Sequence, residues 1–179
     1  MNLRLLVTSL VAFTAPLIAG AEDPSSFEVG SFKFQRPADW QWVPVASPMR
    51  KAQLKIPGSD PKAAAELTFF HFGQGQGGDV QSNAQRWLRQ FKSKEGAEKV
   101  EPLDTGANSA KVTLVSTEGT YASGMPGQPT TPLENYALLG AILEDQQGAV
   151  FAKLTGPAAT VKGVREKFIE FIKAAAAKK

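Results

Sequence analysis

The chain has 179 residues, with 20 lysines and arginines against 17 aspartates and glutamates, and a net charge of +3. Charges so nearly balanced give no reason to expect a nucleic-acid partner. Cysteine is absent, which excludes disulfides, thiolate metal sites, thiol nucleophiles and the cysteine-linked lipid anchor of bacterial lipoproteins.

Residues 1–21 have the pattern of a secretory signal peptide. A cationic start ends at Arg4, residues 5–18 are apolar, and an A-x-A cleavage site ends at Ala21. The apolar stretch is too short to span a bilayer core of ~30 Å as a helix. We therefore expect cleavage after Ala21, a periplasmic or secreted protein without a transmembrane anchor, and a single domain over residues 22–179.

The first part of this domain has the patterns of β-strands. Residues 27–34 form an expected strand, and a turn over residues 36–39 leads to residues 40–43, which together predict an aromatic β-hairpin. Residues 50–56 alternate apolar and polar side chains, which is the period of a half-buried strand.

A third strand is expected over residues 66–72, followed by a glycine-rich loop over residues 73–78. Asp79 is a good N-cap for the helix that should follow. The apolar side chains of this helix recur at 3.6-residue spacing, at Val80, Ala84, Trp87, Leu88 and Phe91.

The second half of the domain is predicted to contain three more strands and a final helix. We expect a linker over residues 96–110, then a strand at 111–120 and a loop at 121–133. The next two strands, at 136–144 and 149–154, should form a hairpin. Residues 155–157 should end the sheet. Thr160 is the expected N-cap of the last helix, whose apolar stripe comprises Val161, Val164, Phe168, Phe171, Ile172 and Ala175.

This order of elements has too few helices for strands and helices to alternate throughout. It predicts an α+β fold with one mostly antiparallel sheet flanked by helices.

The glycine-rich loop matches a known fingerprint. Gly73-x-Gly75-x-x-Gly78 has the dinucleotide-binding spacing and lies between an expected strand and an expected helix. However, Asp79 would stand where the helix N-terminus receives pyrophosphate, and an exported protein meets little NAD. We therefore expect no cofactor, and we interpret the loop, including Gly77, as a flexible connection or a surface binding loop.

His71 is the only histidine in the chain. A metal site there would need carboxylates alone as its other protein ligands, and the spacing offers no such cluster, so no metal is expected. A Ser-His hydrolase would have to use His71, yet no G-x-S-x-G motif surrounds a serine. The ordinary interpretation is a half-buried strand histidine or one at the sheet edge.

The loop at residues 121–133 is long for a compact domain, and such loops are often functional or disordered. It is uncharged and stiffened by proline, and it carries Tyr121 and Met125. This composition is typical of an adaptable contact surface.

Several short motifs resemble a family of uncharacterised exported bacterial proteins over most of the mature chain. They are Phe34-x-x-Pro37-x-x-Trp40, the strand at 66–72 with its glycine loop, Trp87, Gly140-Ala-Ile-Leu143, and Phe151-x-Lys153-x-Thr155-Gly156-Pro157-x-x-Thr160-Val161. More distantly, the chain is similar to the PsbP-like fold, an α/β/α sandwich found in lumenal photosystem proteins and Ran-binding adaptors. That resemblance implies a non-enzymatic module that binds or stabilises a larger assembly, but it transfers no functional residue.

The sequence thus predicts an exported, non-catalytic binding or assembly domain of the bacterial cell envelope, with an envelope protein or a small ligand as its partner. The candidate contact residues are Gly73, Gly75, Gly77, Gly78, Tyr121, Met125 and His71. One alternative is a small envelope hydrolase that uses His71 with a nearby carboxylate, and another is a purely structural component of the envelope.

Overall fold

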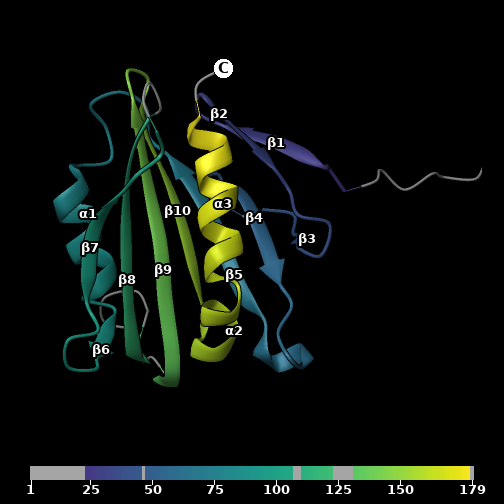
Figure 1. Cartoon of the computed structure of the whole chain (residues 1–179), viewed down its shortest axis with the longest axis vertical. Coiled ribbons are helices and arrows are strands. Elements are labelled where there is room, and N and C mark those ends of the chain that lie inside the picture. The colour runs from purple at the N-terminus through teal and green to yellow at the C-terminus, as the bar shows by residue number, and fades with distance from the viewer. Residues whose placement is uncertain (1–22, 46, 107–109, 123–130, 178–179) are drawn as a thin grey trace, which may run out of the picture.

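A computed structural model describes residues 23–45, 47–106, 110–122 and 131–177. The described residues form an eight-stranded antiparallel sheet in the order β3-β4-β5-β10-β9-β8-β6, with β7 also paired to β8 (Figure 1). The strands are β3 (Gln41–Trp42), β4 (Arg50–Ile56), β5 (Ala65–His71), β6 (Phe91–Ser93), β7 (Lys99–Leu103), β8 (Lys111–Tyr121), β9 (Leu133–Asp145) and β10 (Gly148–Pro157).

The remaining elements cover the two faces of this sheet. A separate hairpin and two helices pack on one face, and they are β1 (Ser26–Val29), β2 (Phe32–Gln35), α2 (Ala158–Gly163) and α3 (Arg165–Ala176). The helix α1 (Val80–Leu88) packs on the opposite face. In Figure 1, α3 lies in front of the sheet. The predicted α+β class, with a mostly antiparallel sheet flanked by helices, is confirmed.

Alternate side chains of β9 enter two separate cores. Leu139, Ala141 and Leu143 point toward α3, whereas Leu138 and Ile142 point toward α1, and all are buried. This follows from the pleat of a strand, whose successive side chains leave on opposite faces. A strand that is buried on both faces therefore reads as a continuous apolar run, as the sequence of β9 does.

The α3 face carries the larger core, which contains many of the aromatic rings. Phe34 of β2 lies 5.3 Å from Phe171 of α3, ring centroid to centroid, and Trp40 lies 5.2 Å from the same ring. Phe34, Trp40 and Phe168 are completely buried. The apolar stripe expected for the final helix is confirmed at Phe168, Phe171 and Ile172.

The N-terminal hairpin differs from its prediction. Residues 27–34 are two short strands, not one, because the chain reverses at Gly30, which has a φ of +58°. This reversal sets Phe27 opposite Phe34, with the rings stacked 5.4 Å apart. The expected partner, Gln41–Trp42, pairs instead with β4.

Two predicted boundaries around α1 and the following linker are wrong. The helix ends at Leu88, and Phe91, expected on its apolar face, begins strand β6. The expected linker at 96–110 contains strand β7, which pairs with β8 from Lys99 to Leu103. Tertiary pairing with β8, which the local sequence does not reveal, supplies the hydrogen bonds of both strands.

The end of the sheet also differs from the prediction. Residues 155–157 do not break β10, which stays paired with β9 through Pro157. The helix begins at Ala158, and the Thr160 hydroxyl donates to the Ala63 carbonyl rather than capping the helix. The final helix is also interrupted at Val164, between α2 and α3.

The contact between β9 and α1 leaves no room for a side chain at Gly140. A Cβ atom there would lie 2.3 Å from Cζ3 of Trp87. We predict that Gly140→Ala lowers the free energy of unfolding by about 1–3 kcal/mol, since the buried indole must move. Gly163→Ala is the control, because nothing lies within 4 Å of its added Cβ, and it should be neutral or stabilise by about 0.5–1 kcal/mol. Urea unfolding measures the free energy of unfolding of both variants. A Gly140→Ala variant as stable as the Gly163→Ala variant would contradict the close contact between Gly140 and Trp87.

Candidate ligand site on the open face of the sheet

The structure places His71 at the end of β5, against the β1–β2 turn. A Cβ atom on Gly30 would lie 2.7 Å from His71 Nδ1, so the imidazole packs directly on the turn backbone. Nδ1 is buried and has no hydrogen-bond partner among the described residues. The imidazole is thus a packing partner of Gly30 and is not held by a carboxylate within the described residues.

The glycine loop follows His71 and lies beside the β9–β10 turn. Gly73, Gly75, Gly77 and Gly78 have φ values of +68° to +85°, which favour glycine. The loop lines a hollow of about 470 Å³ whose other lining residues include Asp79, Glu144 and Asp145. Carboxylates there disfavour an anionic ligand such as a pyrophosphate.

Asp79 caps α1 as the sequence predicts. Its Oδ1 accepts from the Ser82 amide at 2.8 Å, and this hydrogen bond lowers the pKa of the Asp79 carboxyl. The Asp79 carboxylate thus occupies the helix N-terminus, where a dinucleotide-binding fold binds the pyrophosphate.

Tyr121 lies at the other end of the long strands. It closes β8, its ring stacks on Tyr136 at 6.0 Å, and it lies 4.8 Å from Phe91, in both cases centroid to centroid. The glycine loop and Tyr121 therefore lie near opposite ends of β9, a strand about 40 Å long at ~3.4 Å per residue. Met125 lies outside the described residues. The predicted contact residues do not form one site.

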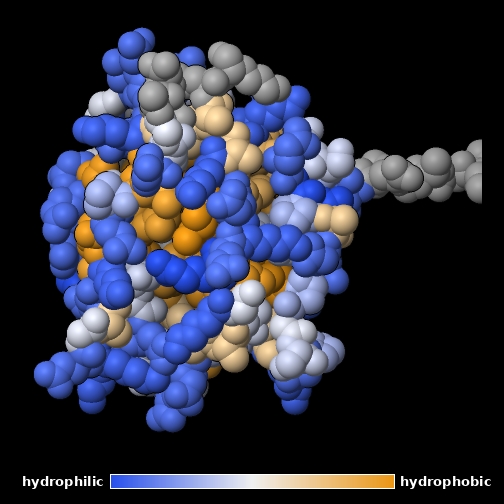
Figure 2. Space-filling view, in the orientation of Figure 1, coloured by the Kyte–Doolittle hydropathy of each residue, from blue (hydrophilic) through white to orange (hydrophobic). Residues whose placement is uncertain are grey.

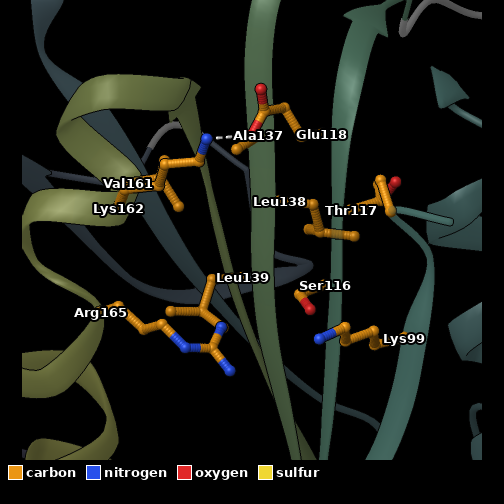
Figure 3. A pocket seen from close by; sticks show the side chains of 11 residues that line it. Lys99, Ser116, Thr117, Glu118, Ala137, Leu138, Leu139, Val161, Lys162 and Arg165 are labelled. Carbon is orange, nitrogen blue, oxygen red and sulfur yellow. Dashed lines mark ion pairs between the residues drawn. The ribbon is translucent and has the colours of Figure 1, made fainter. Parts of the chain in front are cut away.

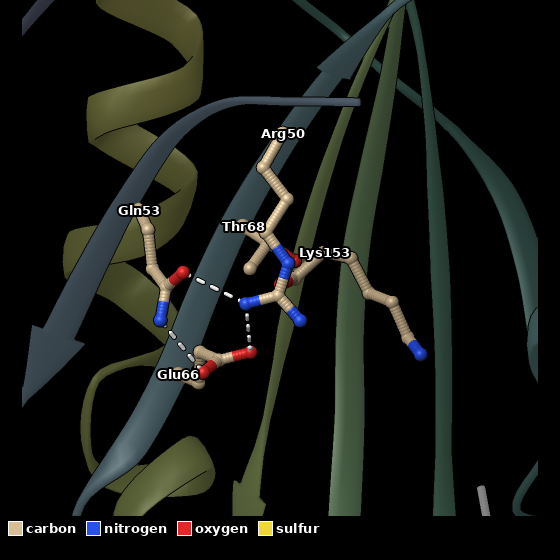
Figure 4. Close-up of polar contacts among 5 residues, drawn as sticks. All are labelled: Arg50, Gln53, Glu66, Thr68 and Lys153. Carbon is tan, nitrogen blue, oxygen red and sulfur yellow. Dashed lines mark hydrogen bonds and ion pairs between the residues drawn. The ribbon is translucent and has the colours of Figure 1, made fainter. Parts of the chain in front are cut away.

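The α1 side of the sheet is covered by its helix only in part. Beyond α1, the strands β4, β5 and β10 carry the polar side chains drawn in Figure 4, on the side away from α3. We call this region the open face and define it by Gln53, Glu66, Thr68, Lys153 and Thr155.

Lys153 is the central side chain of the open face. Its ammonium group donates to Oε1 of Gln90 and lies 5.5 Å from the centroid of the Tyr121 ring. Burial lowers the pKa of Lys153 to about 8, Glu66 opposes that shift, and Arg86 and Arg50 add to it. No carboxylate within the described residues lies at ion-pair distance from this amine.

Glu66, the carboxylate that acts on the pKa of Lys153, already has two other side chains as partners (Figure 4). Arg50 Nη1 lies 3.3 Å from Glu66 Oε1 and donates to Gln53 Oε1 at 2.7 Å. Gln53 Nε2 donates to the second carboxylate oxygen, Glu66 Oε2, at 2.8 Å. Both oxygens of Glu66 thus have partners, and Lys153 is left with a neutral acceptor.

Two hollows lie on this side of the sheet, one on each side of Lys153. The first, which we call the Lys153 pocket, has a volume of about 220 Å³, and its lining includes Phe72, Trp87, Phe151, Arg86, Gln90 and Lys153. The second has a volume of about 400 Å³ and is lined in part by Glu66, Tyr121, Tyr136 and Thr155. The Thr155 hydroxyl is buried and has no hydrogen-bond partner among the described residues.

A further hollow of about 320 Å³ lies on the α3 face, between β8, β9 and the two C-terminal helices (Figure 3). Figure 2 shows apolar side chains gathered beside α3 on this face. Of its three lining cations, Lys162 pairs with Glu118 and Arg165 lies 3.5 Å from Glu101, whereas Lys99 has no ion pair within the described residues. Lys94, which lies outside the lining, also pairs with Glu118. Lys162 and Lys94 lower the pKa of the Glu118 carboxyl. Exposed pairs of this kind contribute little energy. The Lys153 pocket differs in that its lysine is largely buried and has a neutral hydrogen-bond partner.

Sequence reasoning missed Lys153 as a site residue, although a signal was present. It is the only charged side chain between Ala149 and Leu154, a stretch predicted as an apolar strand. Its partners Gln90 and Tyr121 come from distant segments, so only the sheet order brings the three together.

Comparisons with known proteins find similar structures but no relatives by sequence. No family model and no curated protein matches the chain. A Pseudomonas aeruginosa protein of unknown function has 12% identity and a TM-score of 0.47, covering 86% of this chain and 96% of its own. A PsbP from the cyanobacterium Synechocystis has 10% identity and a TM-score of 0.47, covering 88% and 95%. The similarity to a PsbP that the sequence suggests is thus found again in the structure comparison.

The parts of the chain that the structure describes contain neither a membrane-spanning helix nor a cluster of metal ligands. No described helix has the length and hydropathy needed to cross a bilayer. No group of three or more histidine, aspartate or glutamate side chains within the described ranges is arranged to hold a metal ion.

The pKa of Lys153 has a consequence for stability. The pKa of Lys153 is about 8 in the folded protein and ~10.4 in the unfolded chain. At pH values between these two, the unfolded chain binds more protons at this group than the folded protein does. The free energy of unfolding therefore rises with pH over this range. Lys153→Met removes the charge. We predict that its stability relative to the native protein is highest near pH 7 and falls by on the order of 1 kcal/mol per pH unit between ~8 and ~10.

Denaturant unfolding of both proteins at several pH values measures this difference. Lys33→Met, at an exposed position on β2, is the control for losing one lysine charge and should show no comparable trend. A difference between native and Lys153→Met protein that stays constant with pH would show that Lys153 titrates as an exposed lysine does.

Proposed function

We propose that this chain is an exported, non-catalytic binding domain of the bacterial cell envelope and that its ligand binds on the open face, in the Lys153 pocket. The proposal rests on one observation above all. The Lys153 amine is largely buried among rings and has a neutral amide as its hydrogen-bond partner. A buried charge without an opposite charge is costly, and a ligand that supplies the missing interactions relieves that cost.

The composition of the pocket supports the same proposal. Small-molecule sites are concave, mostly apolar and equipped with a few convergent polar groups. The Lys153 pocket combines the rings of Phe72, Trp87 and Phe151 with two cations and one amide. These side chains come from β10, α1 and the residues that follow β5 and α1, so a folded scaffold already holds them in place.

Tyr121 is the sequence-predicted contact residue that belongs to this proposal, since its ring lies beside the Lys153 amine. His71 and the glycines of the loop do not line the Lys153 pocket. A second contact surface at the glycine loop stays a prediction. The hydrolase alternative also stays a prediction, and no contact of His71 with a carboxylate favours it within the described ranges.

Export rests on the sequence of residues 1–21. The described fold is anchored close to the expected cleavage site, because Arg36 Nε donates to the Pro24 carbonyl at 2.7 Å and the Arg36 amide donates to Ser25 at 2.8 Å. We predict that the full chain, expressed in a bacterial host, is recovered from the periplasm or medium and begins at Glu22 by N-terminal sequencing. Protein retained in the cytoplasm with Met1 intact would contradict export.

Binding on the open face is tested by fragment screening of the purified domain, residues 22–179, by nuclear magnetic resonance. The probe is a set of single-ring fragments that carry negative, positive or no charge. We predict that the fragments that bind shift the Trp87 indole N–H and amides of α1, β5 and β10. Phe151→Ala should weaken the affinity of these fragments several-fold, because the Phe151 ring forms part of the pocket wall.

The Gly163→Ala variant serves as the control in this experiment, since position 163 lies at the end of α2, on the opposite side of the sheet. Shifts confined to the glycine loop or to the α3 face would contradict the proposed site. So would an absence of shifts from every fragment at millimolar concentration.

A further inference from the structure

We infer that the Lys153 pocket binds a small amphipathic anion, with a single-ring or short apolar body against Trp87, Phe72 and Phe151 and a carboxylate paired with Lys153 and Arg86. This inference rests on the proposed function and names the chemical class of its ligand.

The charges around the pocket favour an anion. Among the described residues, the charges that act on the pKa of Lys153 are those of Glu66, Arg86 and Arg50. Together with Lys153, this group has three positive charges and one negative charge. Glu66 has both oxygens occupied by Arg50 and Gln53. Arg86 donates to the Asn83 amide oxygen, which is also neutral. Lys153 and Arg86 both line the pocket, and a carboxylate between them would form charge-assisted hydrogen bonds to an anion, which neither side chain makes within the described residues.

The rest of the pocket favours an apolar body of limited size. Phe72 and Trp87 each make an edge-on contact with Phe151, at 5.9 and 6.4 Å between centroids, so three rings form one wall. The volume of about 220 Å³ is below the ~300–1,000 Å³ of sites for drug-sized ligands. A single ring with a short acidic arm fits these dimensions better than a nucleotide does.

The same geometry gives the binding a characteristic pH dependence. Lys153 faces Glu66 from β5, Arg50 from β4, Arg86 from α1, Gln90 after α1, and Tyr121 from β8. Its pKa of about 8 in the free protein means that the amine loses its proton as pH rises from 7 to 9. A bound carboxylate favours the protonated amine and raises that pKa. The affinity should therefore fall about tenfold between pH 7 and pH 9, over which a carboxylate and an arginine keep their charges.

The experiment compares three probes of one shape by calorimetry at constant ionic strength: 3-phenylpropionate, 3-phenylpropan-1-ol and 3-phenylpropylammonium. We expect the carboxylate to bind at least tenfold more tightly than the alcohol at pH 7 and the ammonium probe to bind least. At pH 8.5, titration in buffers of different ionisation enthalpy should show proton uptake on binding.

Three variants separate the role of Lys153 from general charge. Lys153→Met should lose the preference for the carboxylate. Lys153→Arg should keep the preference but lose the weakening between pH 7 and pH 9, since a guanidinium stays charged. Lys33→Met is the matched control on the exposed hairpin and should behave like the native protein. Spectra of each variant that retain the native dispersion verify its fold.

The outcomes separate the inference from the proposed function. If all three probes bind in the pocket with equal affinity, the binding site stands and the inference about an anion fails. If no probe binds there, both fail. If the carboxylate binds but shifts the α3 face around Lys99 and Arg165, or if Lys153→Met keeps the preference, the inference is overturned.

Discussion

The middle of strand β9 is buried on both faces, β10 beside it is buried on the α3 face and in part on the other, and the rest of the structure depends on this constraint. Their alternate side chains feed two cores, one beneath α3 and the β1–β2 hairpin and one beneath α1. An antiparallel sheet can leave one face to water, but a continuous apolar run such as residues 137–143 of β9 requires a cover on each side. The long closing helix supplies one cover, and the nine-residue helix α1 supplies only part of the other.

The incomplete second cover is what creates a candidate site. Strand register sets Lys153 opposite Gly140 on β9 and Thr68 on β5. Gly140 has no side chain because Trp87 of α1 packs directly on it. The lysine side chain therefore extends along the sheet, between the edge of α1 and the Tyr121 ring, where water reaches it poorly. A largely buried charged group that lines a hollow is a common feature of binding sites.

The end of the sheet at the β9–β10 turn differs in charge from the open face. Near the β9–β10 turn, Asp79, Glu144 and Asp145 surround the glycine loop. On the open face, arginine and lysine outnumber the single carboxylate of Glu66. The carboxylates thus disfavour an anion at the fingerprint-like glycine motif, and the anion that we propose would bind at a position that no motif marks.

Local patterns in the sequence determined much of the fold. Alternating residues in β4, the apolar runs of β9 and β10, the Asp79 cap and the apolar stripe of α3 were all predictable, because strand and helix periodicity are set by backbone geometry. The short strands β6 and β7 were not, since they exist through pairing with β8. The site was decided by tertiary structure for the same reason. Lys153, Gln90 and Tyr121 are far apart along the chain, and strand order and register, which depend on the global fit of two apolar faces, bring them together.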